Sequence, residues 1–218
     1  MQLNRQAIGT LSERPDLSIG NLAAAPERVV QFGEGNFLRS FVDWMIDALN
    51  GQGLFGGRVV VVQPIERGAV DLLNTQDCLY TLILRGLQSG QVVEQRRIIT
   101  SISRGIDPYR NWSGFLAVAE QPELRFAVSN TTEAGIAYVD EPRQSQHCPA
   151  SFPAKVTAFL HRRFDRFRGD PGQGMVFLPC ELIDRNGEQL RSCVLRHAAA
   201  WDLGPEFSDW VSKHNRFL

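Results

Sequence analysis

The feature that most constrains the fold of this chain is a Gly-x-Gly turn between an apolar run and an amphipathic segment. The apolar run covers residues 28–32, and the turn consists of Gly33, Glu34 and Gly35. After the turn, apolar residues recur at i, i+4, i+7, i+8, i+11 and i+12, a spacing that places them on one face of a helix. The pattern predicts a strand, a tight turn and a helix over about residues 37–49. The residues on the apolar face are Phe37, Phe41, Trp44, Met45, Ala48 and Leu49.

Such a turn is a candidate phosphate cradle. Backbone N–H groups at the start of a helix lack partners within the helix and carry partial positive charge, so an anion binds there if no side chain blocks it. The turn matches the dinucleotide fingerprint at Gly33 and Gly35, whereas the third glycine position holds Leu38. The pattern favours a nucleotide, and in particular a dinucleotide. A tight turn that binds no ligand is the alternative.

Strand-like and helix-like segments alternate along the rest of the chain. Four consecutive valines at 59–62 suit a strand that is buried on both faces, as in a parallel sheet covered by helices. The alternation predicts an α/β fold with a doubly wound, mostly parallel, Rossmann-like sheet. Gly86 and Gly90 bracket a short connection between two strand-like runs, which predicts an inserted β-hairpin. The predicted strands are residues 29–32, 58–63, 79–84, 92–99, 124–130 and 174–179, and the predicted helices include residues 112–120, 153–167, 190–201 and 207–211.

Polar or glycine-rich segments follow three of the predicted parallel strands. They are Gly33–Arg39, Gln63–Pro64 and Asn130–Glu133. Right-handed crossovers bring the carboxyl ends of parallel strands to one edge of the sheet, and ligands of α/β proteins bind at that edge. We therefore expect the three segments to meet there and to form a site.

Composition and charge exclude several classes of partner. A net charge of −1 gives no long-range attraction to nucleic acid or to a membrane surface, so we expect neither partner. The chain has no apolar run of about 18 residues, the length that a membrane-spanning helix needs. Residues 1–26 are polar and mixed, without the apolar core of a signal peptide, and predict a loose lead-in to a cytoplasmic protein. The four cysteines and four histidines are scattered without metal-ligand spacing, so no metal site is expected.

Four segments of the chain resemble one enzyme family. The first runs from Gln31 to Trp44 and reads QFGEGNFLRSFVDW. The others are residues 75–81 (TQDCLYT), 129–136 (SNTTEAGI) and 179–187 (PCELIDRNG). Together they resemble the tagaturonate reductases (altronate oxidoreductases) of the mannitol dehydrogenase family of polyol-specific long-chain dehydrogenases. The resemblance extends from about residue 26 to residue 218.

The resemblance implies an NAD-dependent enzyme that interconverts tagaturonate and altronate, a sugar acid, without a metal. Members of the family are about twice as long, and a mostly helical C-terminal domain supplies their catalytic lysine. On this basis we expect residues 27–205 to form the NAD-binding domain and residues 206–218 to begin the truncated helical domain. We expect no catalytic residue in this chain, since Lys155 lies in the shared N-terminal half. We also expect the face that docks on the missing domain to be apolar and to drive self-association.

The resemblance gives the first turn a role in binding NAD. We expect Glu34 to point to solvent, because its carboxylate would repel a pyrophosphate. Asn36 is expected to cap the helix or to donate to phosphate. Arg39 has two interpretations, a contact with phosphate or an ion pair with Asp43 four residues later. The predicted cofactor-binding residues of this turn are Gly33, Glu34, Gly35, Asn36, Phe37, Leu38 and Arg39.

The remaining predicted site residues follow later strands. The second strand usually ends in an acid that binds the adenosine ribose, but here it ends in Gln63, whose amide can still bind a hydroxyl group. The nearby Arg67 leaves NADP open as an alternative to NAD. Asn130, Thr131 and Glu133 are expected to lie toward the nicotinamide, with a capped turn as the alternative interpretation. Glu181 follows the last predicted strand of the core and is a candidate to face the cleft.

Three functions remain open from the residues. The chain is a sugar-acid oxidoreductase present as its nucleotide-binding half, or it is a standalone nucleotide-binding module without turnover. The third is an S-adenosylmethionine-dependent methyltransferase, because a Phe-Gly-x-Gly turn after a first strand also binds that cofactor.

Overall fold

The computed structural model describes residues 3–11, 14–132 and 134–218. Its centre is a six-stranded sheet in the order β6-β3-β2-β7-β8-β9, and every neighbouring pair in it is parallel. This arrangement confirms the predicted doubly wound Rossmann-like fold. The strands are β2 (Glu27–Phe32), β3 (Arg58–Val62), β6 (Ile102–Ile106), β7 (Phe126–Ser129), β8 (Val176–Pro179) and β9 (Arg216–Phe217).

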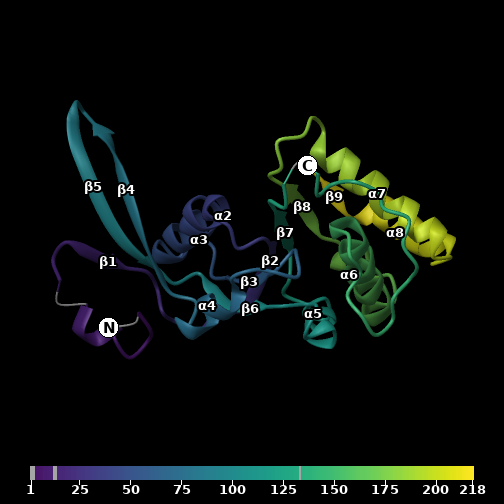
Figure 1. Cartoon of the computed structure of the whole chain (residues 1–218), viewed down its shortest axis with the longest axis horizontal. Coiled ribbons are helices and arrows are strands. Elements are labelled where there is room, and N and C mark those ends of the chain that lie inside the picture. Colours follow the sequence, from purple (N-terminus) through teal and green to yellow (C-terminus); the bar gives the residue numbers. More distant parts are fainter. Residues whose placement is uncertain (1–2, 12–13, 133) are drawn as a thin grey trace.

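Helices cover both faces of this sheet, which explains its apolar strands. Val59 to Val62 of β3 are fully buried, and alternate valines contribute to two separate hydrophobic clusters. Val60 and Val62 pack with α5 (Trp112–Val118), α6 (Phe152–Phe167), α7 (Asn186–Ala200) and α8 (Pro205–His214). Val59 and Val61 pack on the other face with α2 (Asn36–Ser40), α3 (Val42–Gly51) and α4 (Val70–Thr75). Figure 1 shows α6, α7 and α8 gathered at the C-terminal end of the molecule.

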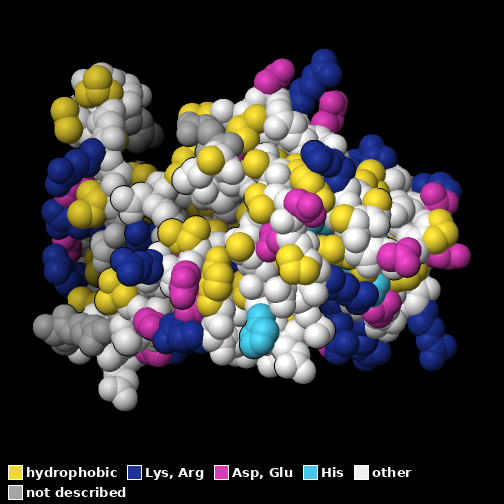
Figure 2. All heavy atoms as spheres, turned by 45° about the vertical axis from the view of Figure 1, so that its right-hand side comes forward, with side chains coloured by type: hydrophobic (Ala, Val, Ile, Leu, Met, Phe, Trp, Pro, Cys, Tyr) yellow, Lys and Arg dark blue, Asp and Glu magenta, His cyan; other side chains and the backbone are white. Residues whose placement is uncertain are grey.

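A long β-hairpin, inserted in the sequence between β3 and β6, projects from the parallel sheet. It consists of β4 (Tyr80–Gln88) and β5 (Gln91–Ile99), which pair in antiparallel register, and it confirms the predicted insertion. Figure 1 shows the hairpin extending away from the core, and Figure 2 shows hydrophobic side chains at its tip. Leu87 and Val92 at the tip are 76% and 84% exposed.

The segment expected as a loose lead-in contains regular structure. The short helix α1 (Ile8–Leu11) is followed by β1 (Leu17–Ile19), which pairs in parallel with β5. Ile8 packs with Leu79 and Ile98 in a third, small hydrophobic cluster. Residues in this segment thus add a third strand to the hairpin sheet.

The helix predicted over residues 37–49 is interrupted. It consists of α2 and α3, with Phe41 between them as the residue that ends one helix and begins the other. Its apolar face also points outward rather than into the core. We call the exposed row formed by Phe37, Phe41, Met45 and Leu49 the apolar stripe; these side chains are 36–48% exposed.

The residues that α3 turns toward the sheet include two carboxylates. Val42 and Ile46 are buried, as expected for a core face, but Asp43 and Asp47 beside them are fully buried as well. Asp47 is satisfied by Arg97 and by the backbone and hydroxyl of Thr100. The inward face of α3 is therefore partly polar, and its outward face is partly apolar.

Two elements lie beyond the expected domain boundary at residue 205. Phe207, Trp210 and Val211 of α8 are buried in the same cluster as α6 and α7. Residues 216–217 form β9, which pairs with Val176 and Phe177 of β8 at the edge of the sheet. Residues 206–218, expected to begin another domain, thus complete the packing of this one in the structure.

None of the helices within the described residues is both long enough and apolar enough to span a membrane.

Candidate functional site

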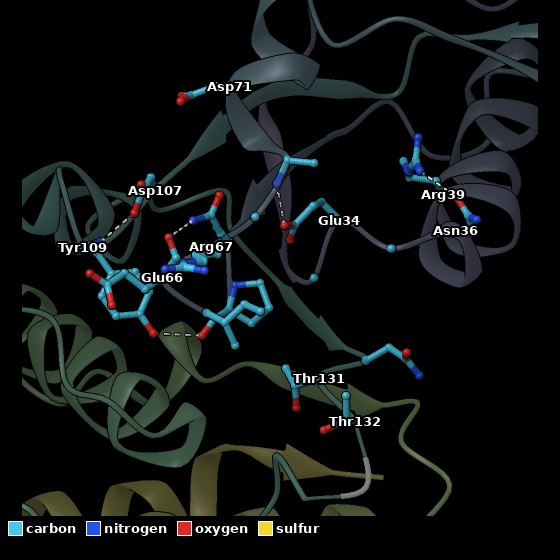
Figure 3. Close-up of a pocket in the computed structure, with 18 of the residues that line it drawn as sticks. Glu34, Asn36, Arg39, Glu66, Arg67, Asp71, Asp107, Tyr109, Thr131 and Thr132 are labelled. Atoms are coloured by element: carbon cyan, nitrogen blue, oxygen red, sulfur yellow. Dashed lines mark hydrogen bonds between the residues drawn. The ribbon is translucent and has the colours of Figure 1, made fainter.

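A cavity of about 1120 Å³ opens at the carboxyl edge of the parallel sheet. The loops after β2, β3, β6 and β7 surround it, and the order of strands reverses between β2 and β7. Such a switch point is where open α/β sheets bind their ligands. Figure 3 shows side chains from all of these loops around the cavity. Its lining residues include Gly33–Asn36, Arg39, Gln63–Ala69, Asp71, Asp107, Tyr109, Arg110 and Asn130–Thr132.

The two glycines of the first turn differ in backbone conformation and surroundings. Gly33 has φ +127°, a conformation that only glycine adopts readily, and a Cβ atom there would lie 3.1 Å from the carbonyl oxygen of Asn130. Gly35 has an ordinary extended conformation, and a Cβ atom there would meet nothing within 4 Å. A side chain at position 35 would therefore occupy open space in the wall of the cavity beside α2.

The backbone of this turn offers unpaired donors to the cavity. Gly33 N–H donates to the carbonyl of Val62, which fixes the turn to β3. Among the described residues, no protein acceptor receives the N–H of Glu34 or of Gly35. Both residues line the cavity, so these two N–H groups are available to an anion.

Glu34 corrects the expectation that its carboxylate points to solvent. Its Oε1 accepts a hydrogen bond from the backbone N–H of Ala69 at 3.0 Å, which ties the first turn to the start of α4 (Figure 3). Gly68 permits this contact, because a Cβ atom there would lie 2.3 Å from Oε1. The side chain thus braces two walls of the cavity against each other.

The other predicted residues of this segment divide into two groups. Asn36 and Arg39 line the cavity and bind each other, since Arg39 donates to Asn36 Oδ1 at 2.7 Å. Asn36 makes no capping hydrogen bond, and Arg39 makes no ion pair with Asp43 within the described structure. Leu38 is buried beneath the turn and Phe37 is half exposed on the apolar stripe, so neither lines the cavity.

The loop after β3 forms the wall next to the first turn. Gln63 is buried, and its amide donates to the carbonyl of Glu66 at 3.1 Å, which curls the loop around it. Arg67 lies on the same wall, and Figure 3 shows it beside Glu66. The amide nitrogen of Gln63 therefore holds the loop in place.

The loop after β7 forms the opposite wall. Asn130 and Thr131 line the cavity, and Asn130 donates to the carbonyl of Cys180 at 2.8 Å. Glu181 is 3% exposed and anchors this loop by accepting hydrogen bonds from Ser129 and Thr131. Thr132 has φ +96°, a strained conformation for a β-branched residue. Glu133, the remaining predicted site residue, lies outside the described residues.

The fourth wall of the cavity was not predicted, because the strand that precedes it, β6 (Ile102–Ile106), was not predicted from the sequence. Asp107 and Tyr109 follow β6, whose sequence Ile-Ser-Arg-Gly-Ile has too few apolar residues to predict a buried strand. Arg110 donates to Asp107 and to Asp71 at 2.6 Å each, and Tyr109 donates to the carbonyl of Pro64. The signal available in the sequence for this wall was the pair of charged residues, Asp107 and Arg110, that soon follow Ile106.

Lys155 lies near the cavity but does not line it. Its side chain is fully buried, donates to the carbonyl of Ala150 at 2.8 Å, and packs on the ring of Tyr109. Burial lowers the pKa of this ammonium group. In this structure the ammonium of Lys155 is thus held inside the protein, and the residue is not among those that line the cavity. No cluster of three potential metal ligands occurs within the described residues.

Comparison with known proteins identifies the group to which this architecture belongs. The family model described as the mannitol dehydrogenase Rossmann domain matches residues 27–218. The chain belongs to the mannitol dehydrogenase family. This membership confirms the resemblance that the sequence motifs indicated, and the matched residues include α8 and β9.

Individual members of the family are similar to this chain over most of its length. An altronate oxidoreductase of Halalkalibacterium halodurans is 48% identical over 193 residues, which are 88% of this chain and 38% of the relative. An altronate oxidoreductase of Pectobacterium atrosepticum is 50% identical over 193 residues, or 88% of this chain and 40% of the relative. The chain thus spans about two fifths of the length of these relatives.

A solved structure of the family shares the fold. The mannitol 2-dehydrogenase of Pseudomonas fluorescens, solved as a ternary complex with NAD and D-mannitol, superposes with a TM-score of 0.78 at 24% identity. The match covers 100% of this chain and 46% of that one. At this level of identity the likeness establishes the fold of the mannitol dehydrogenase Rossmann domain.

Proposed function

We propose that this chain is the NAD-binding part of an altronate oxidoreductase, an enzyme that interconverts tagaturonate and altronate by hydride transfer. The curated relatives with this activity in their names support the proposal. The structural observation that carries it is Gly35, whose absent side chain leaves open space in a cavity at the switch point of the sheet. A dinucleotide is the ligand class that such a crevice accommodates.

The walls of the cavity suggest how the cofactor is held. The free N–H groups of Glu34 and Gly35 face the diphosphate, and Asn36 and Arg39 extend the same polar wall. The loop of residues 63–69 takes the adenosine ribose. Residues 130–132 lie toward the nicotinamide, held in place by Glu181. When bound, the cofactor supplies or accepts the hydride, while the protein supplies geometry and electrostatics.

The groups that act on the sugar acid lie outside this chain in our proposal. Reduction of a ketone requires a proton donor and a group that stabilises the developing alkoxide. The described residues that line the cavity include no lysine and no histidine. The resemblance implies a catalytic lysine in a C-terminal domain, so we infer that the remainder of the longer polypeptide found in relatives carries the proton donor and that this chain alone does not turn over substrate.

The apolar stripe is where we place that remainder. The rings of Phe37 and Phe41 lie against each other in a tilted arrangement, with their centroids 5.4 Å apart, on the outer side of α2 and α3. α2 begins beside the cavity, so a domain that covers the stripe also borders the site. In the isolated chain the same surface is uncovered, and we expect self-association through it.

Replacing Gly35 by valine tests the binding site. The substitution places a side chain in open space, so the protein should fold normally while NADH binding, measured by calorimetry, weakens at least 30-fold. Gly86→Val is the matched control, because Gly86 also has nothing within 4 Å of a Cβ atom but lies on the hairpin. Unchanged NADH affinity of Gly35→Val would refute the site. Binding of S-adenosylmethionine in preference to NADH by the wild-type chain would refute the function.

A turnover assay tests the division of labour. Tagaturonate reduction by this chain should stay at the level of the background without enzyme. A rate comparable to that of the full-length relatives would show that the catalytic groups lie within these residues.

A further inference from the structure

A buried polar pair lies directly beneath the glycine turn. Gln31 of β2 is fully buried, and its amide nitrogen donates both to the carbonyl of Gly33 at 3.1 Å and to Asp43 Oδ2 at 3.2 Å. Asp43 of α3 is also fully buried. A buried strand at the centre of a parallel sheet is ordinarily apolar, so a glutamine here has a cost that the fold does not require.

The contact with Gly33 fixes the direction of one peptide unit. In a trans peptide the C=O and the N–H point in opposite directions. Because the carbonyl of Gly33 points inward to Gln31, the N–H of Glu34 on the same peptide points away from Gln31. This N–H is one of the two free donors of the turn. Gln31 thus orients the N–H of Glu34, one of the two donors that the turn presents.

The second contact makes Gln31 dependent on the charge of Asp43. The amide nitrogen of Gln31 donates to the ionised carboxylate of Asp43 in a charge-assisted hydrogen bond, which is stronger than the bond it makes to the carbonyl oxygen of a neutral carboxylic acid. Asp43 Oδ1 is buried without a partner, so a proton can reside on that oxygen while Oδ2 still accepts from Gln31. Protonation of Asp43 therefore weakens the contact that holds the amide of Gln31 against the carbonyl of Gly33.

We propose that Gln31 and Asp43 are positioning residues that hold the Gly33–Glu34 peptide in its cofactor-binding orientation most firmly while Asp43 is ionised. The inference rests on the proposed function, because it concerns the same turn. It adds a dependence of binding on proton concentration that the comparisons with relatives do not contain.

The surroundings of Asp43 place its change of protonation within a pH range that can be measured on the folded protein. Burial, together with the nearby charge of Asp47, raises the pKa of Asp43 to about 7, although the hydrogen bond from Gln31, the charge of Arg39 and the phenol of Tyr80 oppose the rise. Ser101, in the segment after β5, donates to the backbone carbonyl of Asp43 and makes no hydrogen bond to its carboxylate.

The test measures affinity for ADP-ribose, which carries the diphosphate and does not titrate between pH 6.0 and 8.5. In the wild-type chain the dissociation constant should be about tenfold larger at pH 6.0 than at pH 8.5, the effect of one charge-assisted hydrogen bond. In Asp43→Asn it should vary less than twofold and stay close to the wild-type value at pH 6.0, because a neutral amide oxygen accepts from Gln31 at every pH. The control Asp209→Asn changes an exposed carboxylate of α8 and should retain the wild-type profile.

A second variant keeps the test decisive if Asp43→Asn does not fold. Gln31→Met removes the donor at similar volume and should bind ADP-ribose as weakly at pH 8.5 as the wild type does at pH 6.0. The NMR signal of the Glu34 amide should shift with a midpoint near pH 7 in the wild type and not in this variant. A pH-independent wild type, or a variant that retains the wild-type profile, overturns the inference. A wild type that binds neither ADP-ribose nor NADH at any pH overturns the proposed function as well.

Discussion

The carboxylate of Glu181 accepts both the backbone N–H and the hydroxyl of Thr131, each at 2.9 Å. Its other oxygen accepts from the hydroxyl of Ser129 at 3.0 Å. One buried acid on the loop after β8 thus anchors the loop after the neighbouring strand β7 through three hydrogen bonds. Because Thr131 lines the cavity, Glu181 acts on a ligand only through this loop.

Replacing Glu181 by alanine should destabilise the protein. The change leaves three donors without their acceptor in a buried setting, and we expect a loss of roughly 3 kcal/mol in the free energy of unfolding. Urea denaturation followed by circular dichroism measures it. Glu188→Ala, an exposed acid on α7, should change stability by less than about 0.5 kcal/mol. Equal effects of the two substitutions would contradict the anchoring role.

The parts of the fold that the sequence predicted are those with strong patterns. Four valines at 59–62 and the apolar run before Gly33 identified the two central strands. Two glycines between strand-like runs identified the hairpin. β6 and β9 were not predicted, because β6 has polar residues between its two isoleucines and β9 has only two residues. Their place in the sheet comes from tertiary pairing, which no local pattern records.

The site could be predicted where backbone conformation decides it. Gly33 and Gly35 were found because glycine has a distinctive role, and both line the cavity. The inward position of Asp43 could not be predicted, because an amphipathic pattern implies that the apolar face is buried. Here the apolar face is exposed as the apolar stripe, and the buried carboxylates are bound by distant residues, Asp43 by Gln31 and Asp47 by Arg97. The periodicity of apolar residues along a helix carries no information about such long-range pairs.

The two glycines of the turn should respond differently to alanine. Gly33→Ala forces a side chain into a left-handed conformation and against the carbonyl of Asn130, so we expect a loss of about 2 kcal/mol in stability. Gly35→Ala should leave stability within about 0.5 kcal/mol, because the conformation is ordinary and the space is open. Thermal and urea unfolding of both variants give the comparison. Similar losses in the two would show that Gly35 is also required by the fold.

Stability should fall as the pH rises through neutrality. The pKa of Asp43 is raised from 3.8 to about 7 by burial, so between these values the folded state binds a proton that the unfolded state has lost. This contribution is fully present below pH 4 and is lost as the pH passes 7. Its size is of the order of 4 kcal/mol. In Asp43→Asn the decline should be smaller, and the variant should exceed the wild type in urea unfolding at pH 8. A wild type and variant with parallel pH profiles would contradict the assignment.

Polar substitutions on the apolar stripe should reduce self-association without unfolding the protein. Phe37 and Phe41 are 46% and 48% exposed and their rings lie against each other, so the double variant Phe37→Asn, Phe41→Asn removes apolar surface at little cost to the core. We expect its average mass by light scattering to approach that of a monomer at concentrations where the wild type associates. Leu87→Asn at the hairpin tip removes an equally apolar but separate side chain and should leave association unchanged. If the hairpin variant dissociates the protein and the stripe variant does not, self-association takes place through the hairpin tip. The remainder of the polypeptide then has no reason to dock on α2 and α3.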